Sequence, residues 1–596
     1  MLELTSAGRP VLLNPNTSVQ LESHSPLFDE DVVAGTFSYS IAVPAPPNGP
    51  LYGFPERPDS DADPGAELPA ELAYVGVPLL RGTQRVKSAS PAKYAVQLLG
   101  SLSAASSALN DRLIHSFSYG GVRQMPDKPA GVVGLVPGWV YHANDVARGV
   151  VVTDYVFAPV RVDMFYPDDA GALFNQVPVV LNSWIKYDAP INGLPAGGSF
   201  TPFSNVVKYT PNDDLPGLPQ IDGSFASPFP RLGYVLRCIF EESNFVVDET
   251  RWLTGELAEL VIVSPNRSVR VSFDDDGNNT GAIHSSFYLA DALPAVTVAQ
   301  LLAAVRRALG LVLVVDPVSQ QVAIVQLREL LAAADVLDLT ELAAGPAEVE
   351  LTDEPTAVRL MYDYDPEDEL TQHVEQDQPV APELSAPVAT VAALPATAAA
   401  DEPVEQIRYV EDQDAYYQSR GTGVFPGGLP GIEWKFLVER YAGPVVGTVR
   451  GAEEPEDYGQ GLARTRLGAA PFRPKAGQAN QLDPAPTPWL ELPHMSRPGY
   501  VPAGVATAGY RSTADRPTAL RLLFWRGMQP ASDGSLYPLL TPLATNQGGQ
   551  LVGGLSLRLT GPQGTYQQLL RAWLPVKLRP VRVKQQLRCS VLDLAR

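Results

Sequence analysis

Several short segments of the chain alternate apolar residues with polar or small ones. The first clear example places Phe37, Tyr39, Ile41 and Val43 at every second position and then reaches Pro44. A period of two puts one face of a β-strand on a core, and proline lacks the backbone donor that would continue the hydrogen-bond ladder. The pattern therefore predicts a strand that ends at Pro44.

The alternation continues through "PAELAYVGVPLLRGTQRVKSASPAKYAVQLL", residues 69–99. This segment predicts a strand, a turn near Gly76, a second strand through Val86, a polar turn, and a third strand that carries Tyr94, Val96 and Leu98. Three consecutive strands joined by short turns form a β-meander. The N-terminal part of the chain is thus expected to be a sheet.

The hydrophobic period changes in "TVAQLLAAVRRALGLVLVVDPVSQQVAIVQLREL", residues 297–330. Five apolar side chains recur there at helical spacing: Val298, Leu301, Leu302, Val305 and Leu309. Gly310 stands where the end of a helix favours a residue that adopts positive φ. The strands "LVLVVD" and "QVAIVQL" and a resumed helix at "RELLAAADVL" should follow. The pattern predicts an α-β-β-α module.

The remaining segments give weaker patterns. Residues 101–235 hold short apolar runs between Gly, Pro and Asn clusters, which predict strands and loops but no helix longer than three turns. A short apolar segment containing Cys238, an acidic turn and another strand should follow. Residues 374–406 are rich in Ala, Pro and Val, which favours an extended excursion. Near the C-terminus we expect a short helix running to Pro575, with one face formed by Tyr566, Leu569, Leu570 and Trp573.

Length and composition narrow the possible functions. A chain of 596 residues should hold about three to five folded units, and 57 prolines and 49 glycines limit the share of long helices. The formal charge of −22 argues against a nucleic-acid grip through clustered Lys and Arg. Two cysteines, Cys238 and Cys589, build neither a disulfide framework nor a zinc cluster, and we expect buried free thiols. The sequence shows no secretory leader and no apolar run long enough to span a membrane.

The stretch that most resembles a reactive or metal site is "SFDDDGNNTG", residues 272–281. Asp274, Asp276 and Asn278 have the alternate spacing of a calcium loop. The position that should close such a loop with a carboxylate holds Ser285 instead. Because Asp, Asn and Gly also suit a tight turn, a solvated turn is the favoured interpretation, with a cation on Asp274–Asp276 left open.

Other candidate motifs have simple structural explanations. "SPAK", Ser90 to Lys93, matches a serine acyl-enzyme pattern but lies between two predicted strands. "GTGVFPGG", residues 421–428, lacks the last glycine of a dinucleotide loop. "DYDPEDE", residues 363–369, offers carboxylates for glycoside cleavage, although a strand-end turn at Pro366 explains them better. The six histidines stand singly: His24, His115, His142, His284, His373 and His494. We therefore predict no catalytic, cofactor-binding or metal residue.

The sequence also resembles a known family. "TFSYSIAVPAPPN", "LYGFPERPD" and the meander that follows are similar to the N-terminal barrel of tail hub (baseplate hub) proteins of Bacteroidetes phages and prophages. The 297–330 module, "LRLLFWRGMQP" and "GPQGTYQQLLRAWLPVKLRPV" look like later parts of such hubs. The resemblance covers about half of the chain. It implies paired β-barrel domains and mixed α/β domains, assembled as a homotrimer that forms a ring at the end of the tail tube.

These patterns together predict a mainly β fold with minor α+β, made of tail-hub-type β-barrel domains and smaller mixed α/β domains. The predicted domains are an N-terminal β-barrel (1–115), a strand-rich insertion (116–250), a mixed α/β domain (251–345), a second β domain including the excursion 374–406 (346–480), and a closing β/α segment (481–596).

The expected function is that of a structural subunit of a phage tail tip, not an enzyme. It would close or continue the tail tube and anchor tip or receptor-binding proteins, in a virion assembled in the host cytoplasm. Expected partners are further copies of the chain, the tail tube or distal tail protein, the tape measure and fibre proteins. The genome would pass through without specific binding, and no stable membrane insertion is expected. A carbohydrate-active β-sandwich enzyme and a receptor-binding adhesin are the alternatives.

Overall fold

The computed structural model describes the chain from residue 2 to residue 586, with gaps. The described residues are 2–19, 21–22, 37–38, 40–60, 63, 66–100, 109–124, 138–162, 180–182, 184–186, 200–202, 227–266, 271–273, 279–283, 286–316, 318–332, 340–351, 357–368, 370, 388, 393–395, 406–410, 415–424, 430–439, 442–449, 454–470, 474–475, 478–482, 490–500, 512–513, 515–531, 534–546, 549–579 and 581–586. Strands outnumber helices, as the sequence predicts, and no helix among these residues is long and apolar enough to cross a membrane.

The N-terminal part forms an eight-stranded, mainly antiparallel sheet that curls into a half-barrel. Its order is β2-β1-β6-β7-β8-β4-β3, with β5 also paired to β8. The strands are β1 (Leu2–Ser6), β2 (Arg9–Val11), β3 (Leu21–Glu22), β4 (Phe37–Ser38), β5 (Ile41–Pro44), β6 (Leu68–Tyr74), β7 (Val77–Ala89) and β8 (Lys93–Gly100). The predicted meander is confirmed as β6, β7 and β8.

Two local predictions in this sheet meet different outcomes. The strand predicted from Phe37 is divided into β4 and β5, and β5 ends at Pro44 as expected; the proline-rich stretch after it is a helix, α1 (Ala45–Tyr52), and not only a connection. Prolines are tolerated in the first helical turn, where the backbone N–H groups have no helical acceptor, and Gly53 ends the helix in the left-handed conformation. At the "SPAK" segment the Ser90 N–H donates to the Lys93 carbonyl, which forms the expected turn between β7 and β8.

The predicted α-β-β-α module is confirmed. Helix α5 (Val298–Leu309) begins with a capping box at Thr297 and ends at Gly310, whose φ is 62°. The antiparallel strands β21 (Leu311–Val315) and β22 (Gln321–Gln326) follow, and α6 (Leu327–Ala332) comes after them. Strand β16 (Val246–Val247) joins this sheet beside β22.

Residues 232–242, a short apolar segment in the sequence analysis, form helix α4 (Leu232–Glu242). Five of its side chains repeat at helical spacing and are fully or almost fully buried: Leu232, Val235, Leu236, Ile239 and Phe240. Cys238 lies on this helix as a half-buried free thiol, and burial raises its pKa. Helix α3 (Gly138–Ala147) precedes it and, as expected for residues 101–235, is shorter than three turns.

The central body combines two further sheets of three strands with one of four. The first places β24 (Ala357–Asp363) between β28 (Ala442–Gly447) and β29 (Glu456–Ala463). The second is β17 (Leu260–Val263), β36 (Arg521–Pro530) and β37 (Leu536–Thr541). The four-stranded sheet has the order β12 (Val180–Leu181), β11 (Val160–Val162), β33 (Leu490–Met495) and β30 (Arg466–Ala470).

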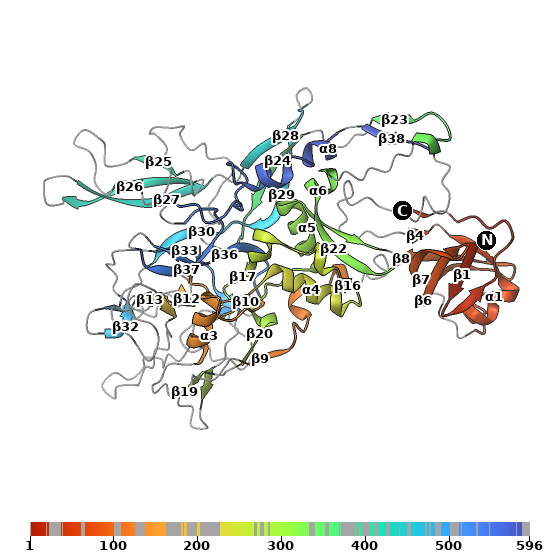
Figure 1. Cartoon of the computed structure of the whole chain (residues 1–596), viewed down its shortest axis with the longest axis horizontal. Coiled ribbons are helices and arrows are strands. Elements are labelled where there is room, and N and C mark those ends of the chain that lie inside the picture. The colour runs from red at the N-terminus through yellow and green to blue at the C-terminus, as the bar shows by residue number, and fades with distance from the viewer. Residues whose placement is uncertain are drawn as a thin grey trace.

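The smaller sheets lie around this body in Figure 1. A three-stranded sheet consists of β25 (Ile407–Val410), β26 (Ala415–Val424) and β27 (Pro430–Glu439). The two-stranded pairs are β9 (Val122–Gln124) with β20 (Ser286–Tyr288), β10 (Tyr155–Val156) with β15 (Phe229–Pro230), β13 (Trp184–Lys186) with β14 (Phe200–Pro202), β18 (Val271–Phe273) with β19 (Asn279–Ile283), β23 (Glu348–Leu351) with β38 (Val581–Lys584), β31 (Pro474–Lys475) with β32 (Gln478–Leu482), and β34 (Gly499–Tyr500) with β35 (Ser512–Thr513).

The predicted C-terminal helix is present but differs in form. A π-helical turn (Tyr566–Leu570) leads to α8 (Leu574–Lys577), and Pro575 lies in the first turn of α8 instead of ending the helix. The prediction that the helix runs to Pro575 is therefore wrong in its end point, because proline fits the first turn of a helix without losing a hydrogen bond. Trp573 is 1% exposed and packs over Gly310 at the end of α5.

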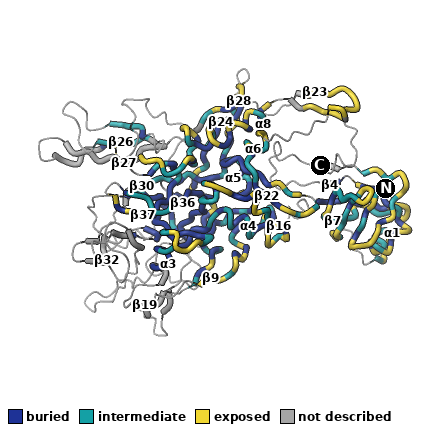
Figure 2. The backbone as a smooth tube through the Cα atoms, viewed as in Figure 1, coloured by how far each residue is buried: buried dark blue, intermediate teal, exposed yellow. Residues whose placement is uncertain are grey.

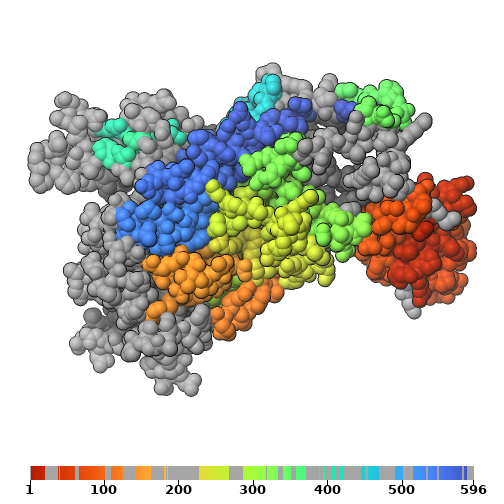
Figure 3. Space-filling model, in the orientation of Figure 1, coloured from red at the N-terminus to blue at the C-terminus, as the bar shows by residue number. Residues whose placement is uncertain are grey.

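The buried side chains form three clusters. One is confined to residues 4–98 of the half-barrel, and two larger ones fill the central body. Figure 2 shows the buried residues concentrated in that body, and Figure 3 shows the N-terminal residues as a lobe on one side of it. The Arg81 guanidinium donates to the Val318 carbonyl in the β21–β22 turn, 3.5 Å away, where the lobe meets the body. The five predicted domain ranges stay predictions.

Candidate functional site

The sequence motifs that suggested chemistry fall into two groups. Residues 274–278, and with them the Asp274–Asp276 candidate, lie outside the described residues; the strands that flank them, β18 and β19, pair as an antiparallel hairpin. Most of 374–406, Cys589, and the histidines at 24, 284 and 373 are also outside. Within the described residues, no group of three or more His, Cys, Asp or Glu is placed to hold a metal ion.

The "DYDPEDE" segment lies at the centre of the molecule. Strand β24 ends at Asp363, and a turn follows at Pro366 and Glu367, as predicted. The turn points two carboxylates into the interior, where Asp365 is 1% exposed and Asp368 is 2% exposed. Burial of charged carboxylates requires partners of opposite charge.

Two buried arginines supply that charge. Arg497 follows β33 and Arg521 opens β36, and each is 1% exposed. Arg521 donates to Asp365 Oδ2 at 2.9 Å and to Asp368 Oδ2 at 2.8 Å, and Arg497 also binds Asp365 Oδ2. The second nitrogen of Arg497 reaches the exposed Glu367. We call Asp365, Asp368, Arg497 and Arg521 the ion cluster.

Backbone groups bind the remaining carboxylate oxygens of the ion cluster. The Glu367 N–H donates to Asp365 Oδ1 at 3.1 Å. Asp368 Oδ1 accepts from the Ser496 N–H at 2.9 Å and from the Leu370 N–H at 3.1 Å. Every oxygen of the two aspartates thus has at least one donor, which is the condition under which a buried ionic network is stable.

Electrostatics keeps Asp365 of the ion cluster ionised. Burial alone would raise the pKa of Asp365, but the charges of Arg521 and Arg497 and the hydrogen bond from Arg497 outweigh it and hold that pKa below its ordinary value. A carboxylate that stays charged and fully bonded does not exchange protons with a substrate. The cluster therefore ties the end of β24 to β33 and β36, and it has the geometry of a structural lock.

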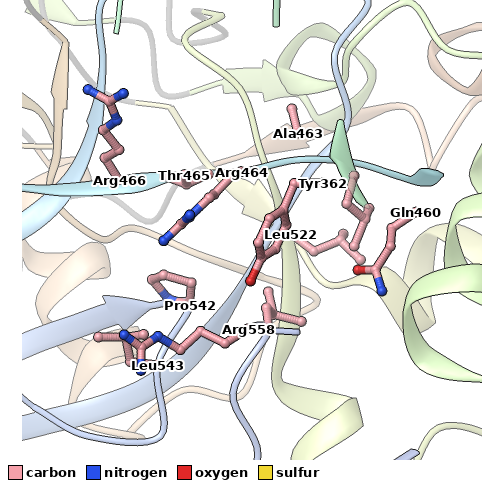
Figure 4. Close-up of a pocket in the computed structure, with 12 residues that line it drawn as sticks. Tyr362, Gln460, Ala463, Arg464, Thr465, Arg466, Leu522, Pro542, Leu543 and Arg558 are labelled. Atoms are coloured by element: carbon pink, nitrogen blue, oxygen red, sulfur yellow. The ribbon is translucent and has the colours of Figure 1, made fainter. Parts of the chain in front are cut away.

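A cavity of about 40 Å³ lies beside this lock, with the phenol of Tyr362 on β24 in its wall. Three arginines line it: Arg464, Arg466 and Arg558. Figure 4 shows Arg464 and Arg558 reaching toward the space around Pro542, whereas the Arg466 guanidinium points away from it. The Arg464 guanidinium carbon lies 4.9 Å from the centroid of the Tyr362 ring. The Tyr362 hydroxyl accepts from the Leu559 N–H at 2.7 Å.

The cavity is rich in donors and poor in groups that move protons. Gln460 and Thr465, 1% and 7% exposed, contribute an amide and a hydroxyl to its wall. Burial raises the pKa of Asp363, the nearest carboxyl in the sequence, and the Gly461 N–H and Arg307 only partly offset this. Because side chains alternate along a strand, Asp363 points to the opposite face of β24 from Tyr362. The three arginines also make further interactions, so the cavity wall is part of the packing.

A second and larger hollow of about 700 Å³ opens between the loop after α3 and the turn of β36. Val151 and Val152, 38% and 91% exposed, border it together with Trp525 and Met528. Arg231 and Glu259 cross its wall as an ion pair of 2.6 Å. Its lining is apolar with paired charges, which suits contact with a protein segment better than catalysis.

Two of the single histidines are structural in the way the sequence suggests. His142 is buried on α3, and its Nε2 lies 2.8 Å from the Tyr155 hydroxyl. Burial lowers the pKa of both His142 and His115 and so favours the neutral imidazole. His142 is buried in the central body, and His115 is half-buried.

Sequence analysis missed the arginines of the ion cluster. One signal was present, since Arg521 stands inside the apolar run "ALRLLFW", where a charged residue must find a buried partner. The acidic "DYDPEDE" offered that partner, but the sequence gives no measure of their proximity. Arg497 and the cavity arginines carry no comparable signal.

Comparison with known proteins adds no assignment. No family model, no curated protein and no solved structure matches the chain. The interpretation of its function therefore depends on the sequence and the geometry described above.

Proposed function

We propose that this chain is a structural subunit of a phage tail tip, a tail hub that assembles as a homotrimeric ring around a channel. In this role it binds other copies of itself, the tail tube or distal tail protein, and tip or fibre proteins. The genome passes through the ring without specific binding. The chain performs no catalysis.

The observation that carries the proposal is the N-terminal half-barrel. Its eight strands curve around their own core, and within the described residues the end strands β2 and β3 do not pair with each other, so the sheet is open. Figure 3 shows this lobe on one side of the central body. An open curved sheet with free edges is suited to assembly, because free edges accept strands or cover from a neighbour.

The ion cluster gives a second line of support. The enzyme alternative would use carboxylates near residues 363–369 for acid and base catalysis, which requires two carboxyl groups that face a substrate. Asp365 and Asp368 instead bind buried arginines. The segment that the alternative relies on thus stabilises the body of a large, closely packed subunit.

The charge balance fits passage of a polyanion. The chain has 66 acidic and 44 basic side chains, and a ring wall of that composition does not hold phosphates. We expect the channel wall to be neutral to acidic. A continuous band of Lys and Arg around the pore of the assembled ring would contradict this part of the proposal.

The test is to locate the protein in particles. Antibodies against the purified chain should label the tip of the tail in electron micrographs of phage particles from its source, and the purified chain should form rings with a central channel. Labelling of a cell surface would favour the adhesin alternative. Clearing of peptidoglycan or polysaccharide in a zymogram, lost when one carboxylate is replaced, would favour the enzyme alternative.

A further inference from the structure

The ribbon formed by β23 and β38 is the least protected paired structure in the described chain. Its register aligns Glu348 with Lys584 and Val349 with Val583. The two valines, 67% and 63% exposed, face each other across the ribbon with no cover. Figure 1 shows the ribbon away from the central body, and in Figure 2 the residues around the β23 label are coloured as exposed.

Such a ribbon is not expected to be stable alone. Two strands without a third neighbour or a packed face are marginal in water. This ribbon also joins distant parts of the chain: Gln585 beside β38 donates to the carbonyl of Gly345, 240 residues away in the sequence. The exposed ribbon gains little from burial of its own side chains. The valine face therefore requires a cover.

The two edges of the ribbon carry opposite charge. Strand β23 reads Glu-Val-Glu-Leu and β38 reads Val-Arg-Val-Lys. One ion pair joins them within the ribbon, where Lys584 Nζ lies 2.7 Å from Glu350 Oε2 at 63% and 52% exposure. Within the described residues neither strand has a second strand beside it. Each strand of the ribbon thus forms an outer edge of its sheet and carries charges of a single sign.

We propose that the ribbon binds a second copy of this chain, with the β38 edge of one copy added to the β23 edge of the next. Edge addition extends the backbone hydrogen-bond ladder of the ribbon from one copy to the next and sets basic against acidic side chains. It also places Val583 of one copy beside Val349 of the other. The two edges of one ribbon complement each other, and another copy of the chain carries both. Such a contact is head-to-tail, and repeated around an axis it closes a ring.

This inference deepens the proposed function and rests on it only for the expectation that the assembly is a ring at a tail tip. The contact itself concerns the purified chain. A chain that associates through the ribbon but does not label a tail tip would keep this inference and reject the proposed function. If the chain labels a tail tip but its association does not depend on the ribbon, the proposed function is kept and this inference is rejected.

The experiment measures the mass of the full chain in solution by native mass spectrometry and light scattering. The wild-type chain should be oligomeric, and Val349→Lys with Val583→Lys should weaken its association by at least about tenfold, because burial of both valines is lost. Val246→Lys with Val449→Lys is the matched control, since it adds the same two charges at valines that are 55% and 42% exposed in the central body. It should leave the oligomer intact.

Charge reversal tests the pairing of the edges. Glu348→Lys with Glu350→Lys makes both edges basic, and Arg582→Glu with Lys584→Glu makes both acidic, so neither variant should associate alone. An equal mixture should associate, because each variant then offers the edge that the other lacks. Circular dichroism with the wild-type melting temperature confirms that the variants fold. A monomeric wild-type chain, an oligomer insensitive to the valine change, or a mixture that stays monomeric would each overturn the proposal.

Discussion

The ion cluster and the β23–β38 ribbon perform the same task in different surroundings. Both join chain segments that are far apart in sequence, and both use acidic and basic side chains to do so. In the cluster the charges are at most 2% exposed and each carboxylate oxygen has a donor. In the ribbon the paired charges are more than half exposed and the valines face water.

The difference shows which of these two charged contacts is stable within a single chain. Buried charges are strongly destabilising when one partner is removed, whereas exposed pairs contribute little. The cluster is therefore a closed element of the folded subunit. The ribbon is an open element whose stability depends on a neighbour, and this separates the core of the subunit from its contact surface.

The largest effect should come from removing one arginine of the cluster. Arg521→Ala leaves Asp365 and Asp368 buried with only one of their two arginines, Arg497, and we expect a loss of about 3 to 5 kcal/mol in the free energy of unfolding. Chemical denaturation measures it. Arg237→Ala is the control, since Arg237 pairs with the exposed Glu249 at 2.8 Å on the surface. Equal losses for the two variants would show that the cluster is not the lock described here.

Trp573→Ala should have an effect of similar size at the base of the ribbon. The indole is 1% exposed and is the last large side chain buried before the chain leaves the core for β38. Its removal opens a cavity next to Gly310 and should cost about 3 to 5 kcal/mol. Thermal melting provides the measurement. An unchanged melting temperature would mean that the C-terminal helical turns are peripheral.

The sequence predicts individual helices and strands better than it predicts which regions form the core and which form the contact surface. Helix α5 was located closely because its apolar spacing and the terminal Gly310 lie within one short segment. Helix α4 was missed although Leu232, Val235 and Leu236 show helical spacing. Helix α1 was missed because prolines are poor helix formers, and although Pro46 and Pro47 fit its first turn, Pro50 lies inside the helix.

The candidate site depends on proximity, which one sequence does not contain. The turn at Pro366 follows from its composition, but its contacts with Arg497 and Arg521 arise only when three strands of different sheets come together. The pairing of β23 with β38 is of the same kind, since neither segment has an unusual pattern alone. Local sequence patterns therefore predicted several helices and strands, but they did not predict the contacts between distant elements.

Acid should weaken the cluster only at low pH. Because the pKa of Asp365 is lower in the folded chain than in the unfolded chain, its contribution to stability is fully present above the ordinary aspartate pKa, near 3.9, and is lost as the pH falls through the lower folded value. Asp365→Asn removes this contribution. The difference in melting temperature between the wild type and Asp365→Asn should shrink as the pH falls from 7 toward 3, and a constant difference would contradict the role of ionised Asp365.

The smallest effect is expected at the ribbon of the isolated subunit. Glu350→Gln removes the charge of a pair that is about half exposed, and in the monomer it should change the free energy of unfolding by at most about 1 kcal/mol. Denaturation at a protein concentration where the chain is monomeric gives this value. The same change should reduce self-association more than it reduces stability, because in the assembly that edge meets a basic strand of the next copy. A large loss of monomer stability with unchanged association would show that the ribbon is part of the folded core of the subunit. The distinction between the ion cluster and the ribbon would then be wrong.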